Sequence, residues 1–182
     1  LATGRFGFNN DYLGFVPLGL NEALLSVNFE YISPIPWSDG FAEVVGQPLP
    51  WGELVAALAS RQGVIDCSTL AASDPLLATI RAVSDQAMAD LGLGVIHLQR
   101  QGGIWQRIPD RRERRVDGLA GWRDPGARLP ITGPATAVFM APQCLGYDDG
   151  LGAAAVGTFA NCAGGTTPWG TGPTSTTTPQ GQ

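Results

Sequence analysis

The sequence of 182 residues contains no lysine, a single histidine and three cysteines. Without lysine, the chain can supply neither a Schiff-base lysine nor the lysine of a phosphate-binding P-loop. The lone histidine, His97, excludes a metal site built from two or three imidazoles of one chain. The cysteines at positions 67, 144 and 162 form no CxxC pair, which indicates neither a zinc ribbon nor a disulfide scaffold. Metal or acid–base chemistry must therefore use carboxylates, amides, arginines or cysteine.

Charge is also sparse, since only 15% of the residues are charged and the net charge is −5. We expect no nucleic-acid partner, because affinity for nucleic acid comes mainly from neutralising phosphates. No apolar run reaches the roughly 20 residues that span a bilayer, so we expect no membrane span. Hydrophobic residues make up 44% of the chain, which is too much for disorder over its whole length.

Alternation of apolar and polar residues predicts two strands within residues 1–33. The second strand, Leu25 to Tyr31, has an apolar face, and its other face carries Asn28 and Glu30 side by side. A hairpin is predicted over residues 95–108. Short strands are predicted over residues 135–140 and 153–159, and the 25 glycines and 14 prolines indicate frequent turns.

Helical spacing of apolar residues predicts helices over residues 53–61 and 74–91, the second with Ser73 as its N-cap. Between the strands and the first helix, residues 34–50 hold four prolines and are predicted to form a loop. Residues 109–130 are rich in arginine; acidic residues interrupt the cluster, which favours a solvated surface loop over a phosphate-attracting one.

His97 alternates within a predicted hairpin strand and has no plausible partner ligands nearby, so we interpret it as structural. The last residues, 171–182, contain no apolar side chain to bury, and we expect them to be disordered. Residues 1–170 are then predicted to form the folded domain.

The segment that most suggests chemistry is 157–170, in which Cys162 leaves a predicted strand and precedes Gly164 and Gly165. Glycines let the backbone approach a ligand closely, and successive backbone N–H groups can bind an anion. On residue type alone, a buried cysteine beside a tight turn is the favoured explanation.

Five segments, in order, resemble the PhoX-type alkaline phosphatases, a family of secreted, metal-dependent phosphomonoesterases. Residues 157–170 resemble the family's NCAGG-x-TPWGT motif. Residues 6–15 (FGFNNDYLGF) resemble its FGFNND-x-x-GF stretch, and residues 27–31 (VNFEY) resemble its VNHEY strand. Residues 131–135 (ITGPA) resemble its ISGPA stretch, and residues 94–105 resemble its GVSVVEV…DGG-x-W hairpin. One such segment would be weak evidence for the resemblance, whereas five segments in the family's order are specific evidence.

The resemblance implies a propeller fold, so we expect a mainly β chain with inserted helices that forms a partial β-propeller. It also implies a mixed iron and calcium cluster that binds phosphate. Cys162 matches the iron ligand, and Glu30 and Asn28 match the strand that carries oxygen donors, which calcium prefers. Asn10 and Asp11 are weaker candidates for the metal or phosphate shell. The implied substrates are small phosphate monoesters, and the implied location is periplasmic or secreted.

The sequence departs from the family at two places. Phe29 stands where the family has histidine. Where the family continues with further blades, this chain runs into residues 171–182, so we expect an N-terminal portion, truncated or altered in frame near Thr171. Such a portion is expected to have little or no activity alone. Two alternatives stay open: a non-enzymatic calcium-binding or surface protein that keeps the scaffold, and a fragment that does not fold stably.

Overall fold

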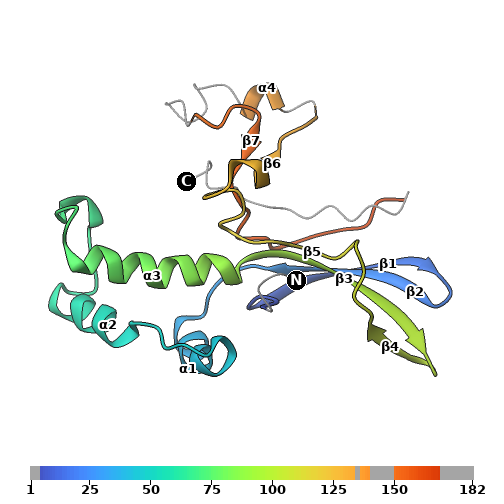
Figure 1. Cartoon of the computed structure of the whole chain (residues 1–182), viewed down its shortest axis with the longest axis horizontal. Coiled ribbons are helices and arrows are strands. Elements are labelled where there is room, and N and C mark those ends of the chain that lie inside the picture. Colours follow the sequence, from blue (N-terminus) through green and yellow to red (C-terminus); the bar gives the residue numbers. More distant parts are fainter. Residues whose placement is uncertain (1–4, 134–135, 140–149, 169–182) are drawn as a thin grey trace.

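The computed structural model describes residues 5–133, 136–139 and 150–168, and an antiparallel sheet lies at its centre (Figure 1). Four strands follow one another in the sheet, and a fifth pairs with β3 beyond the stretch that pairs with β4. The strands are β1 (Asn10–Gly19), β2 (Glu22–Phe29), β3 (Gly92–Gln101), β4 (Ile104–Arg107) and β5 (Arg114–Val116).

Three helices are inserted between β2 and β3 and gather beyond one end of the sheet (Figure 1). Their shared core contains Trp37, Phe41 and Val83, and the Trp37 and Phe41 rings meet edge-on with centroids 5.2 Å apart. The buried Asp90 carboxylate accepts a hydrogen bond from the Trp37 indole and forms an ion pair with Arg5. The helices are α1 (Pro34–Val45), α2 (Trp51–Ser60) and α3 (Pro75–Asp90).

Helix α1 contradicts the loop predicted over residues 34–50. Pro34 and Pro36 lie in the first turn of α1, where backbone N–H groups have no partner within the helix and proline is tolerated. Gly46 ends the helix with a φ of 76°, a conformation that favours glycine. The prolines therefore start this helix and do not prevent it.

The two predicted helices are confirmed with shifted ends. Helix α2 begins two residues before the predicted start, at Trp51. The N-cap of α3 is Asp74 and not Ser73, because the Asp74 carboxylate accepts a hydrogen bond from the Leu76 backbone N–H at 2.9 Å. A short 3-10 turn, Cys67–Thr69, lies between the two helices.

Downstream of β5, the chain forms a small two-stranded ladder of β6 (Leu129–Pro130) and β7 (Ala154–Ala155). The strand predicted over residues 153–159 is thus only two residues long. The strand predicted over residues 135–140 is wrong for its described part, which is helix α4 (Thr136–Phe139). A short apolar run has no periodicity that separates a strand from a helical turn.

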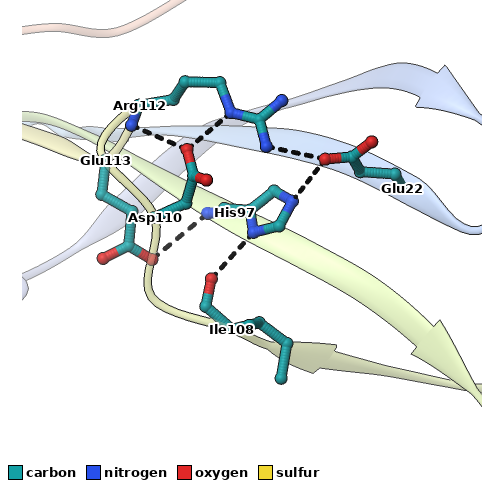
Figure 2. Close-up of polar contacts among 6 residues, drawn as sticks. All are labelled: Glu22, His97, Ile108, Asp110, Arg112 and Glu113. Atoms are coloured by element: carbon teal, nitrogen blue, oxygen red, sulfur yellow. Dashed lines mark hydrogen bonds and ion pairs between the residues drawn. The ribbon is translucent and has the colours of Figure 1, made fainter.

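His97 is buried in β3, as its structural interpretation requires, with 2% of its surface exposed. Figure 2 shows its imidazole between two oxygen atoms: Nδ1 lies 2.8 Å from the Ile108 carbonyl and Nε2 lies 2.9 Å from Glu22 Oε1. Arg112 donates to the same Glu22 oxygen and to Asp110. These contacts hold the loop that follows β4 against β2 and β3.

The arginine-rich segment is less solvated than its sequence suggests. Arg107 forms an ion pair with Glu113. The Glu113 side chain is largely covered, with 5% of its surface exposed. Arg115 donates hydrogen bonds to three backbone carbonyls around the junction of α3 and β3 and to the carbonyl of the next residue of β5. Its guanidinium lies 4.8 Å from the Phe29 ring centroid. Arg115 is therefore a structural residue that ties β5 to this junction.

In coarse terms the predicted architecture is confirmed: antiparallel sheets with inserted helices. The described strands form an open sheet and a separate ladder, so the partial propeller stays a prediction. Within the described ranges, no helix combines the length and apolar character that crossing a bilayer requires.

Candidate metal centre

Three potential metal ligands come together where β1 begins and β2 ends. One ligand atom from each of Asp11, Glu30 and Cys162 lies within 4.8 Å of the others. Asp11 is the second residue of β1, and Glu30 directly follows β2. Because these two strands pair antiparallel, with Asn10 opposite Phe29, the pairing itself brings the two carboxylates together.

A local irregularity in the pairing lies directly at Asp11. The register shifts between Asn10 and Leu13, so that Asp11 and Tyr12 together stand opposite Asn28 alone. Such an extra residue bends a strand and changes where its side chains point, and it recurs beside active sites. Asp11 is exposed at this irregularity.

Cys162 reaches the carboxylates from a part of the chain more than a hundred residues away. Its carbonyl accepts a hydrogen bond of 2.9 Å from the Asn28 side-chain amide. Upstream, the Gly157 N–H donates to Ala120 and the Thr158 N–H donates to Asp117. The segment is therefore attached both to β2 and to the turn after β5.

The two glycines after Cys162 have different surroundings. A Cβ added to Gly164 would lie 2.3 Å from Cδ1 of Tyr12, so only glycine allows this contact with β1. A Cβ added to Gly165 would meet nothing within 4 Å. Close packing thus requires glycine at position 164 and leaves position 165 open.

The charges around the Cys162 thiol are negative. Hydrogen bonds to Asp11 and Glu30, together with desolvation and the charges of the same two carboxylates, raise the pKa of the thiol to about 11. Without a cation, the thiol therefore stays protonated at neutral pH and the two carboxylates repel an anion. The same charges attract a cation, which would displace the thiol proton on binding.

The donor set suits the cations that the resemblance implies. Carboxylate oxygens are preferred by hard cations such as calcium, and a thiolate is a soft ligand that binds iron. Three donors do not complete the six to eight oxygens typical of calcium. The cluster therefore fits part of a metal site that combines oxygen and sulfur ligands.

The other predicted site residues lie around this cluster. Asn28 is fully buried, and its Oδ1 has no hydrogen-bond partner among the described residues. Asn10 is exposed at the first position of β1, next to Asp11. Sequence reasoning ranked Asp11 below Asn28, whereas the structure places Asp11 among the three clustered ligands. Sequence reasoning also overlooked Thr158 and Asn161, which are both buried. The Thr158 hydroxyl donates a hydrogen bond to Asn161, which directly precedes Cys162 in the motif.

The fold and this cluster together define a β-sheet protein with a candidate site for metal cations. A family model described as alkaline phosphatase PhoX matches residues 2–176. The chain therefore belongs to the PhoX alkaline phosphatase family, which confirms the resemblance.

Among solved structures, the chain is similar to Pseudomonas fluorescens PhoX in complex with vanadate, a transition state analogue. The two are 29% identical, and the match has a TM-score of 0.52. It covers 93% of this chain and 22% of the other, so this chain spans about a fifth of the length of that phosphatase. A search of curated proteins finds no match.

Proposed function

We propose that this chain carries one part of the metal site of a phosphatase that hydrolyses small phosphate monoesters. The observation that carries the proposal is the cluster of Asp11, Glu30 and Cys162, whose ligand atoms lie within 4.8 Å of one another. Membership of the PhoX family supports a phosphate ester as substrate. The vanadate bound to the Pseudomonas relative, described as a transition state analogue, agrees with this substrate class.

Each residue of the site has a distinct task in this proposal. Cys162 would hold iron through its thiolate, and Glu30 and Asp11 would hold calcium through their carboxylates. Bound cations supply positive charge that polarises the phosphoryl oxygens of an ester. The negative charge of the two carboxylates would attract the cations, and the backbone around Gly164 and Gly165 would offer N–H groups to an anion.

We expect residues 1–182 by themselves to turn over substrate slowly or not at all. The described residues contribute three clustered ligands, two of them negatively charged, and the chain spans 22% of the solved relative. A phosphate dianion is repelled by such a site unless further cations and donors neutralise it. The family's location, periplasmic or secreted, is proposed for this chain as well.

The thiol gives a reason to keep a second function, a non-enzymatic calcium-binding protein that retains the scaffold. A pKa of about 11 for Cys162 means that the protonated thiol persists at neutral pH unless a strongly binding metal replaces its proton. Calcium could then bind through the two carboxylates alone. Iron in the purified protein therefore favours the phosphatase site, and calcium without iron favours the binding protein.

Metal analysis of the purified chain tests the proposal, combined with release of p-nitrophenol from p-nitrophenyl phosphate after adding calcium and iron. We expect bound iron with a thiolate charge-transfer band that Cys162→Ala removes. Cys67→Ala is the matched control, because Cys67 is also an exposed free cysteine and lies outside the cluster. Iron binding that survives Cys162→Ala would overturn the proposed site. Robust turnover that Cys162→Ala abolishes would instead overturn the expected inactivity of the isolated chain.

A further inference from the structure

Asn28 is fully buried in β2 and links this strand to the segment that carries Cys162. Its Nδ2 donates a hydrogen bond of 2.9 Å to the Cys162 carbonyl. Glu30 follows two residues later along the same stretch of chain, so one hydrogen bond connects the backbone of the cysteine to the strand that carries its carboxylate partner.

The orientation of the Asn28 amide follows from its surroundings. A reversed amide would place Oδ1 against the Cys162 carbonyl, so that two acceptors would face each other. With Nδ2 directed at the carbonyl, Oδ1 remains buried and has no partner among the described residues. A buried acceptor without a partner costs free energy. The Asn28 side chain nevertheless keeps the orientation that forms the hydrogen bond to Cys162, which indicates that this bond determines how the side chain lies.

A second buried amide stabilises the turn that leads into Cys162. Asn161 is also fully buried, and its Oδ1 accepts a hydrogen bond of 2.8 Å from the Thr158 hydroxyl. Between them, Ala160 has a φ of 54°, a left-handed conformation that is rare for a residue with a side chain. The turn that leads into Cys162 is therefore held by side-chain hydrogen bonds against its intrinsic preference.

From these contacts we propose that Asn28 is a positioning residue for Cys162 and not a metal ligand, with Thr158 and Asn161 as its support. The hydrogen bond from Asn28 holds the cysteine backbone so that the thiol meets Asp11 and Glu30. The proposal rests on the metal site proposed above, and it gives Asn28 a different role from the oxygen donor that the family resemblance implies. The positioning role also predicts that loss of Asn28 changes the reactivity of Cys162 in the metal-free chain.

Two substitutions separate positioning from ligation. Asn28→Ala removes the donor to Cys162, and Asn28→Asp replaces it with a carboxylate that repels the carbonyl but is a better oxygen ligand. With cobalt(II) as the probe metal, positioning predicts that both variants lose affinity by about 10- to 100-fold and lose the thiolate-to-cobalt charge-transfer band. Ligation by Asn28 predicts that Asn28→Asp keeps or raises the affinity. Asn21→Asp, at an exposed site in the turn between β1 and β2, controls for the added charge.

A metal-free measurement tests the inference independently of the proposed function. Iodoacetamide labelling followed by peptide mass spectrometry gives the alkylation rate of Cys162 relative to that of the exposed Cys67 in the same molecule. Without the hydrogen bond from Asn28, the Cys162 segment is no longer held against the end of β2 and the reagent reaches the thiol more freely, so the rate ratio should rise severalfold. Thr158→Val should shift the ratio in the same direction by a smaller factor, and it provides a second variant if Asn28→Ala does not fold.

The outcomes are distinguishable. A wild-type chain that binds no cobalt overturns the proposed metal site, and the alkylation ratio then still decides the role of Asn28. An unchanged ratio in every variant that folds, as judged by far-ultraviolet circular dichroism, overturns the positioning role. Retained cobalt affinity in Asn28→Asp overturns it as well, in favour of ligation.

Discussion

The His97 imidazole and the Glu22 carboxylate form a contact of 2.9 Å between the middle of β3 and the first residue of β2. The second ring nitrogen of His97 faces the Ile108 carbonyl, so both neighbours of the ring are acceptors. Arg112 contacts the same Glu22 oxygen at 2.6 Å and places a positively charged group beside the carboxylate (Figure 2).

Glu22→Gln should destabilise the chain more at neutral pH than in acid. Hydrogen bonds from Arg112 and His97 lower the pKa of Glu22 below its ordinary value of 4.5. A group whose pKa is lowered by folding stabilises the protein above its unfolded-state pKa, and this contribution disappears as the pH falls through the folded-state value. The midpoint of thermal unfolding should therefore differ between Glu22→Gln and wild type at about pH 7, and the difference should shrink at about pH 3.

Glu43→Gln removes the same charge from an exposed position in α1 and serves as the control. Its effect on the unfolding midpoint should be small at both pH values. A Glu22→Gln difference that stays constant from neutral to acidic pH would contradict the assignment of Glu22 as a stabilising carboxylate.

Phe29→Ala should cost about 3–5 kcal/mol of the free energy of unfolding. Phe29 has no exposed surface, and its ring lies edge-on to Phe6 at a centroid distance of 4.9 Å and beneath the Arg115 guanidinium. Urea denaturation gives the difference, with Phe15→Ala as the control because 45% of the Phe15 surface is exposed. Equal losses for the two variants would show that the buried end of β2 does not contribute the main packing of the sheet.

Local patterns predicted much of the sheet and of the helices. Alternating residues predicted two strands where β1 and β2 lie, and alternation with a glycine turn predicted the hairpin of β3 with β4. Helix α1 was missed because proline was interpreted as a breaker, although it lies in the first turn, where it is harmless. Strand β5 was missed because three residues of an arginine-rich segment carry no periodic signal, and only pairing with β3 makes them a strand.

The candidate site was predictable to a smaller extent. The family resemblance drew attention to Cys162, Glu30 and Asp11, which the structure then brings together. Alternation placed Asn28 on the polar face of its strand beside Glu30, but a sequence pattern cannot reveal that a distant segment covers that face. Asn28 is consequently buried and bonded to the Cys162 carbonyl.

Cobalt(II) binding should strengthen as the pH rises. The Cys162 thiol has a pKa of about 11 and must lose its proton to ligate a metal, so protons compete with the metal throughout the neutral range. Between about pH 6 and 8 the apparent affinity should rise by about tenfold per pH unit, and Cys162→Ser should flatten this dependence. Isothermal titration in two buffers of different ionisation enthalpy measures the released proton directly. Binding without proton release would show that the thiol does not ligate the metal.

Gly164→Ala and Gly165→Ala should differ sharply in their cobalt(II) affinity, although the two positions are adjacent and the substitution is the same. The new methyl group at position 164 would lie 2.3 Å from the Tyr12 ring, whereas at position 165 it would enter open space. Tyr12 follows Asp11 on β1, so relieving the clash requires a shift of the Tyr12 ring, of the Cys162 segment or of the strand that carries the carboxylate. Gly164→Ala should therefore weaken cobalt(II) affinity by about tenfold or more, and Gly165→Ala should leave it near the wild-type value. Equal affinities in the two variants would show that contact with Tyr12 does not determine the distance between the thiol and Asp11.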